Sequence, residues 1–141
     1  MRVTRFLTAA GMALALAVTM SVTSLAQAKT DEDYDKLMKA VGAANGAMRG
    51  AAKEQNAAGV SAEAKKMVAL FKDAQSFWTA RKNTEAAEWA GAAMKHAAAI
   101  ETAGGDMTVA MGHMKELGGT CQTCHAKYRE KTDTGFMIKK M

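Results

Sequence analysis

Apolar residues recur every three or four positions along four stretches of this chain, and that spacing predicts amphipathic helices. We expect the helices at about residues 31–55, 61–78, 84–103 and 106–128. No useful stretch alternates apolar and polar residues with a period of two, so no strand is predicted and residues 132–141 are expected to be irregular. The inward-facing stripes are Tyr34, Met38, Val41, Met48, Ala52; Ala64, Met67, Val68, Phe71, Ala74, Trp78; Ala86, Trp89, Ala93, Ala97, Ile100; and Ala110, Met114, Leu117, Cys121, Cys124, Tyr128.

Residues with helix-capping chemistry stand near the predicted ends. Ser61, Asn83 or Thr84, and Asp106 have side-chain oxygens that can accept a hydrogen bond from the first free backbone N–H groups of a helix. Gly104-Gly105 is typical of a helix end, because glycine adopts the left-handed conformation without cost. The connections predicted from these signals are short.

Short connections make successive helices antiparallel, so we predict an all-α fold, an antiparallel up-down-up-down four-helix bundle. Bundles of this kind build cofactor sites from side chains that face one another across the core. The chain contains no proline, no internal repeat and no low-complexity linker, and a single domain is expected.

The N-terminal residues have the pattern of a secretory signal peptide. Arg2 and Arg5 precede a mostly apolar run from Leu7 to Val22, and Ala26-Gln27-Ala28 is a small-x-small cleavage site. We expect residues 1–28 to be removed, residues 29–141 to form the bundle, and the protein to be periplasmic. An uncleaved membrane anchor is the alternative, but the apolar run is short for a membrane span.

Charge excludes one class of partner. The chain has a formal net charge of +5, and removing residues 1–28 leaves 17 basic and 14 acidic residues, a net charge of +3. This balance is not typical of a nucleic-acid-binding protein. The one cluster of basic residues is either a solvated helix end or a docking rim for an acidic redox partner; it comprises Lys127, Arg129, Lys131, Lys139 and Lys140.

Cys121-Gln122-Thr123-Cys124-His125 is the most specific motif of the chain, because Cys-x-x-Cys-His is the attachment site of a c-type haem. The two thiols form thioethers with the haem vinyl groups and the imidazole ligates the iron. On a helix, residues three and four apart share a face, so all three side chains can address one porphyrin. The alternatives are a redox-active dithiol and a zinc site. A closed zinc site has four ligands, and the chain has only two cysteines.

Antiparallel packing identifies a partner for His125 on the other side of the iron. The start of the first helix lies level with the end of the fourth, so Met38, two turns into the first helix, is at the height of His125. Met/His ligation favours electron transfer. His113 is about 18 Å back along the same helix, His96 lies at the opposite end, and Met137 would require the tail to fold over the haem. Met38 is therefore the predicted distal ligand, although it could instead only pack over the iron.

Three further features bear on the site. Trp78 and Trp89 fall at the haem end and are expected to wall the pocket. Gly42, Gly46 and Gly50 lie on one face of the first helix, where glycine weakens the helix. Close packing within the bundle, packing across a homodimer, or clearance for the haem would each explain them.

These motifs resemble the cytochrome c′ family, the class II c-type cytochromes, over essentially the whole chain that follows the signal peptide. The specific part of the resemblance is Ala103-Gly104-Gly105-Asp106 and the run from Leu117 to Arg129, which contains the haem motif. The resemblance implies a four-helix bundle with one covalently attached haem c.

Within this family the residue at the distal position separates two functions. Members with leucine or phenylalanine there are five-coordinate and bind small gases, whereas members with methionine resemble the low-spin cytochrome c556 branch, which carries electrons. Aligning Met38 to Gly42 on the family's first helix puts Met38 at this position. The family often has an arginine one turn earlier, near the propionates, where this chain has Tyr34. Tyr34, Lys36 or Arg81 could replace it, and Arg129 matches the family's basic residue after the motif.

The sequence therefore predicts a periplasmic monohaem electron carrier that is not an enzyme and exchanges electrons with partner proteins. The alternative is a five-coordinate cytochrome c′ that binds nitric oxide or carbon monoxide. A haem peroxidase is disfavoured, because no distal histidine with a partner arginine is in place to activate peroxide. A membrane-spanning mature form is not expected, and a homodimer is left open.

Overall fold

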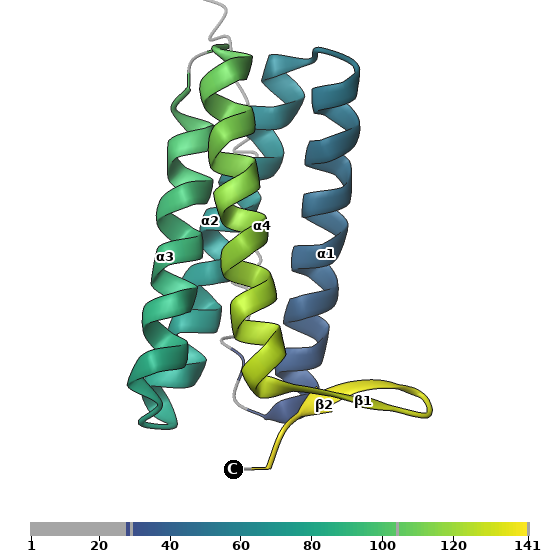
Figure 1. Ribbon diagram of the computed structural model, residues 1–141, viewed down its shortest axis with the longest axis vertical. Coiled ribbons are helices and arrows are strands. Elements are labelled where there is room, and N and C mark those ends of the chain that lie inside the picture. The colour runs from purple at the N-terminus through teal and green to yellow at the C-terminus, as the bar shows by residue number, and fades with distance from the viewer. Residues whose placement is uncertain (1–27, 29, 104, 141) are drawn as a thin grey trace, which may run out of the picture.

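The computed structural model describes residues 28, 30–103 and 105–140, and the predicted signal peptide lies almost entirely outside this part of the chain. Four helices follow one another, and a β-hairpin comes after them (Figure 1). They are α1 (Asp31–Lys53), α2 (Ala57–Ala80), α3 (Thr84–Glu101), α4 (Met107–Tyr128), β1 (Arg129–Thr132) and β2 (Gly135–Ile138).

Each helix packs against its neighbour in sequence, as in an up-down bundle. The contact is most extensive between α2 and α3, followed by α1 with α2 and α3 with α4. In contrast, α1 and α4 approach each other only loosely, so the bundle is open along this edge. No helix in the described residues is long and apolar enough to cross a membrane.

The helix caps agree with the sequence at two of the predicted positions. The side chain of Asp106 accepts a hydrogen bond from the Val109 N–H (3.0 Å), and that of Asn83 accepts one from the Ala86 N–H (3.0 Å). The prediction for α2 was wrong by one turn, because Asn56 and not Ser61 caps it. The third helix ends at Glu101, before the glycine pair that was expected to end it.

The predicted stripes pack into the core, although some of their members are only partly buried, and the core also contains Leu37, Val60, Leu70 and Phe77, which the stripes omitted. Alanine supplies much of it on α2 and α3, and small side chains let two helices approach closely. The largest fully buried side chains include Phe77, Trp78, Met48 and Met67, each no more than 2% exposed. Among the described residues, no polar or charged residue is buried.

The tail corrects the sequence analysis. Residues 132–141 were expected to be irregular, but residues 129–138 form an antiparallel hairpin in which Arg129 pairs with Ile138 and Thr132 with Gly135. Asp133 and Thr134 make the two-residue connection. The hairpin leaves the end of α4, and β2 lies against α1, so it crosses the open edge of the bundle.

The three glycines of α1 rule out one of the explanations that the sequence analysis gave for them. A methyl group added at Gly42, Gly46 or Gly50 would meet no atom within 4 Å, so these residues do not serve close packing inside the bundle. Gly42 borders the cavity described below, whereas Gly46 and Gly50 do not.

Candidate functional site

A cavity of about 720 Å³ occupies the open edge between α1 and α4. This volume lies within the range of roughly 300–1,000 Å³ that is usual for small-molecule and cofactor sites. Helices α1 and α4 form its sides, α2 and α3 form its floor, and the hairpin borders its mouth. The loose contact between α1 and α4 is therefore where the space for a ligand arises.

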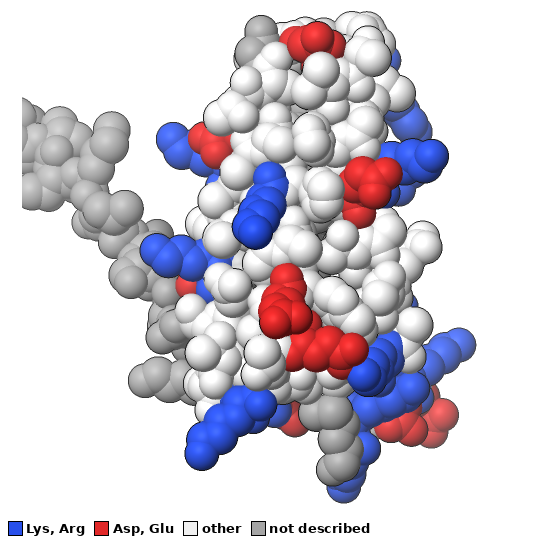
Figure 2. Space-filling model, turned by 60° about the vertical axis from the view of Figure 1, so that its left-hand side comes forward, with Lys and Arg blue, Asp and Glu red and all other residues white. Residues whose placement is uncertain are grey.

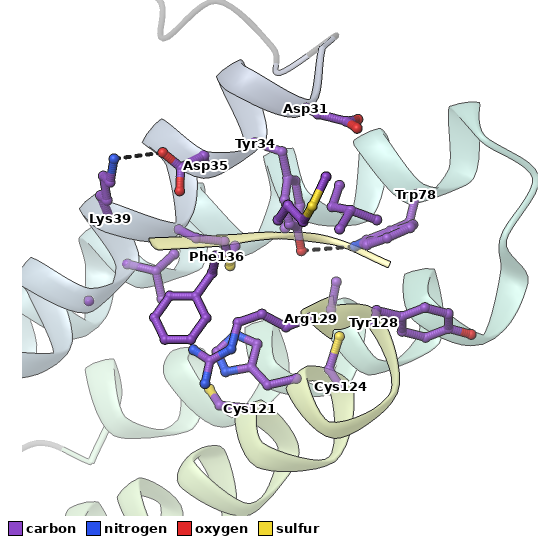
Figure 3. Close-up of a pocket in the computed structure, with 18 of the residues that line it drawn as sticks. Asp31, Tyr34, Asp35, Lys39, Trp78, Cys121, Cys124, Tyr128, Arg129 and Phe136 are labelled. Carbon is purple, nitrogen blue, oxygen red and sulfur yellow. Dashed lines mark hydrogen bonds and ion pairs between the residues drawn. The ribbon is translucent and has the colours of Figure 1, made fainter. Parts of the chain in front are cut away.

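Cys121, Cys124 and His125 line this cavity from the last two turns of α4 (Figure 3). All three side chains are half-buried, and both thiols are free. The helical spacing that was expected to bring them to one face is present, because α4 continues unbroken to Tyr128. Two sulfur atoms and one imidazole thus border the same cavity.

The surroundings of the thiols disfavour their ionised form. Burial, and next to it the neighbouring Cys121, raises the pKa of Cys124 to about 11, and burial also raises the pKa of Cys121. Their position near the C-terminal, negative end of α4 acts in the same direction. Reactive dithiols need a lowered pKa, because the thiolate is the nucleophile. This environment argues against a redox-active dithiol.

The imidazole of His125 is favoured in its neutral form. Burial lowers the pKa of His125, and the positive charge of Arg129 lowers it further. A neutral imidazole has a lone pair available for a metal. Within the described residues, no group of three or more His, Cys, Asp or Glu side chains could hold a metal ion, so a closed zinc site finds no support.

Across the cavity, Met38 and Tyr34 line the α1 side. Met38 is partly buried against the core and faces the same cavity as His125, as the height argument required. The hydroxyl oxygen of Tyr34 accepts a hydrogen bond from Trp78 Nε1 (2.9 Å), and burial raises the pKa of the phenol (Figure 3). The phenol is therefore neutral and fixed in orientation.

Aromatic side chains close the end of the cavity. Trp78 and Trp89 both line it, as predicted, and the ring of Tyr128 lies near both, with centroid separations of 5.2 and 5.8 Å. The Tyr128 hydroxyl donates to a Glu85 carboxylate oxygen (2.6 Å), which also pairs with Lys127. These contacts tie the end of α4 to the start of α3 and keep the wall of the cavity apolar.

The hairpin adds residues that sequence reasoning missed. Phe136, Met137 and Ile138 line the cavity, and the Arg129 guanidinium stacks on the Phe136 ring at 4.1 Å from its centroid. The sequence analysis set Met137 aside because the tail would have to fold over the haem; the tail does fold over the cavity, so that expectation was wrong. Met137 therefore joins Met38 and the buried Met67 as a third methionine at the cavity, although its side chain is 45% exposed.

The basic residues proposed to hold propionates separate into two groups. Lys36 pairs with Glu32 (2.8 Å) and Arg81 pairs with Asp31, and neither lines the cavity. Arg129 does line it, and so does Lys39, which the sequence analysis did not select. Lys39 also forms an ion pair with Asp35 (2.6 Å) at the rim.

Neither His96 nor His113 lines the cavity, in agreement with the prediction that they are not iron ligands. The residues that do line it fit a c-type haem by their chemistry: two thiols and an imidazole on one wall, a thioether opposite, and mostly apolar surroundings. We also compared the chain with protein-family models, curated proteins and solved structures, and none of them was found to match it.

Proposed function

We propose that this protein is a monohaem c-type cytochrome of the cytochrome c′ type that carries single electrons. The observation that carries the proposal is that Cys121, Cys124, His125 and Met38 all border one largely apolar cavity. A thioether-bound haem with histidine and methionine ligands would supply a one-electron Fe³⁺/Fe²⁺ couple.

Each residue has a role that follows from its surroundings. Cys121 and Cys124 would hold the haem covalently, and His125, neutral because of burial, would be the proximal ligand. Met38 would be the distal ligand. Trp78, Trp89 and Tyr128 would exclude water, which would limit reorganisation of the solvent when the charge changes.

Basic residues at the rim of the cavity would interact with the haem propionates and with partner proteins. Arg129 and Lys39 are the basic residues of the cavity lining that would pair with propionates, and Tyr34 would contribute its hydroxyl. Lysine and arginine side chains gather at the end of the molecule that carries the hairpin (Figure 2). Acidic residues lie among them, so we propose only a mixed docking rim for a redox partner there.

The proposed setting is the periplasm, because residues 1–28 have the signal-peptide pattern and thioether attachment of haem is expected in an exported protein. The second candidate, a five-coordinate gas-binding protein, would apply if Met38 only packs over the iron.

Haem attachment is tested by expression with a cytochrome c maturation system, followed by mass spectrometry under denaturing conditions. The full chain should lose residues 1–28 and gain the mass of one haem, and the Cys121→Ser, Cys124→Ser double variant should carry none. Replacing Ser61 and Ser76 by Ala is a matched control that should leave attachment intact. A chain that matures without haem would overturn the proposal.

A further inference from the structure

His96 on α3 and His113 on α4 form a pair outside the proposed haem cavity. The two Nδ1 atoms are 3.3 Å apart, and the ring centroids are separated by 5.6 Å with an interplanar angle of 43°. The sequence analysis considered the two residues only as iron ligands and set both aside. The packing of α3 against α4 brings them together although 17 positions separate them in the chain.

The distance between the two nitrogens matches metal chelation. Zinc binds imidazole nitrogen at about 2.0–2.1 Å with tetrahedral angles, and two such nitrogens on one ion lie roughly 3.3–3.4 Å apart. One ion could therefore bind both Nδ1 atoms with little movement of either helix. In the metal-free pair, an Nδ1–H of one ring donates to Nδ1 of the other. Binding would require only that this proton move to Nε2 of the same ring, since both rings can remain neutral.

The location makes the pair accessible and preorganised. Both side chains are half-buried, so the rings are held by their helices while solvent reaches them. His113 lies twelve residues before His125 on the same helix, about 18 Å away along its axis. An ion at the pair would therefore be independent of the haem cavity, and its coordination could be tested without disturbing that site.

We propose that His96 and His113 form a two-imidazole binding site for a divalent first-row transition metal ion. Imidazole suits Zn²⁺, Ni²⁺ and Cu²⁺, and the Irving–Williams order makes Cu²⁺ the tightest binder. No third His, Cys, Asp or Glu of the described residues joins the pair, so water completes the coordination sphere and the site is open and exchangeable. By clamping α3 to α4, the ion stabilises the folded bundle.

The test is titration of the full-length, signal-processed protein with Cu²⁺ in a buffer that does not chelate metals. Cys121 and Cys124 are either thioether-bound or alkylated beforehand, so that thiols cannot take the ion. We expect one equivalent to bind, an EPR spectrum with hyperfine structure from two nitrogens, and a rise in Tm with added Zn²⁺.

Four single variants make the result specific. His96→Gln and His113→Gln should each weaken Cu²⁺ binding at least about ten-fold, because one ligand of a chelate is lost, and should abolish the Zn²⁺-dependent rise in Tm. Lys95→Gln and Lys115→Gln, exposed neighbours on the same two helices, should bind Cu²⁺ as the parent does.

Absence of binding by the parent, or unchanged binding by either histidine variant, would overturn the proposal. If a variant fails to fold, the nitrogen count in the EPR spectrum of the parent decides, since any value other than two imidazole nitrogens contradicts the site. The metal site does not depend on the proposed haem function. A haem-free protein that still binds Cu²⁺ at the pair would refute only the cytochrome assignment.

Discussion

Two helix pairs of this bundle differ in how they pack: α2 and α3 are in extensive contact, whereas α1 and α4 are separated by a gap. Between α2 and α3, alanines and larger apolar side chains pack closely, as at Ala64, Ala86 and Ala97, none more than 1% exposed. Between α1 and α4, half-buried methionine, cysteine and histidine side chains border a cavity. The first region stabilises the bundle, and the second contains the cavity of the proposed haem site.

The difference teaches how a small bundle can hold a large ligand. Three of the four neighbouring contacts are enough to order the helices, so the fourth can stay open. A ligand attached to α4 and bound also from α1 would close this edge, and the hairpin already lies across it. The following predictions separate the two regions.

The largest effect is expected from His125→Ala in the haem-loaded protein, because it removes the proposed proximal ligand of the iron. Native coordination of the haem iron should be lost completely. The α-helix content should remain, because the substitution does not touch the α2–α3 contact. Optical spectra and circular dichroism measure the two quantities. His113→Ala, on the same helix but outside the cavity, is the control and should keep the native spectrum. A native spectrum for His125→Ala would refute the assignment of the ligand.

Phe77→Ala tests the packed side of the bundle, where α2 contacts α1. This side chain is 2% exposed and stacks on Tyr34 at 4.3 Å between centroids. Its truncation should lower the free energy of unfolding by about 3–5 kcal/mol. The control is Phe136→Ala on the hairpin, where the ring is 51% exposed; denaturant unfolding should show a much smaller loss. Equal losses would mean that the hairpin belongs to the core.

Met38→Ala tests the open region at a smaller cost in stability, because the side chain is only partly buried. The iron should become high-spin and bind carbon monoxide readily, since its distal ligand is gone. Met137→Ala is the matched control from the hairpin and should leave the spin state unchanged. If the two variants exchange behaviour, Met137 and not Met38 is the ligand.

The smallest effect is expected from Glu85→Gln, which loosens the tie between α3 and the end of α4. Hydrogen bonds from Lys127 and Tyr128 hold the pKa of Glu85 below its ordinary value of 4.5. The carboxylate therefore contributes stability at neutral pH that is lost as the pH falls through its lowered pKa. The difference in Tm between parent and variant should be largest near pH 7 and vanish at strongly acidic pH. A difference independent of pH would exclude this ion pair as its cause.

The sequence predicted the four helices and their inward faces, because the apolar spacing is repeated over long stretches and local caps such as Asn83 and Asp106 mark the ends. It missed the hairpin at residues 129–138. This segment is too short for periodicity to reveal. Asp133 and Gly135 mark a turn, but Arg129, Glu130 and Lys131 before it are not β-prone residues.

For the site, the sequence selected Cys121, Cys124, His125 and Met38, and all four border the cavity. It missed Lys39, Phe136 and the pairing of His96 with His113, because each depends on which helices or strands lie side by side and at what height. Local pattern does not encode such distances between elements. Tyr34 lines the cavity too, but its bond to Trp78 could be found only in the structure.

The most direct test of the central claim is a set of optical and EPR spectra of the haem-loaded protein, oxidised and reduced, with and without carbon monoxide. We predict a low-spin spectrum that carbon monoxide barely changes, because the proposed ligands His125 and Met38 would occupy both axial positions of the iron. A high-spin spectrum with ready carbon monoxide binding would contradict the electron-carrier assignment, and Met38 would then be only a wall of the pocket.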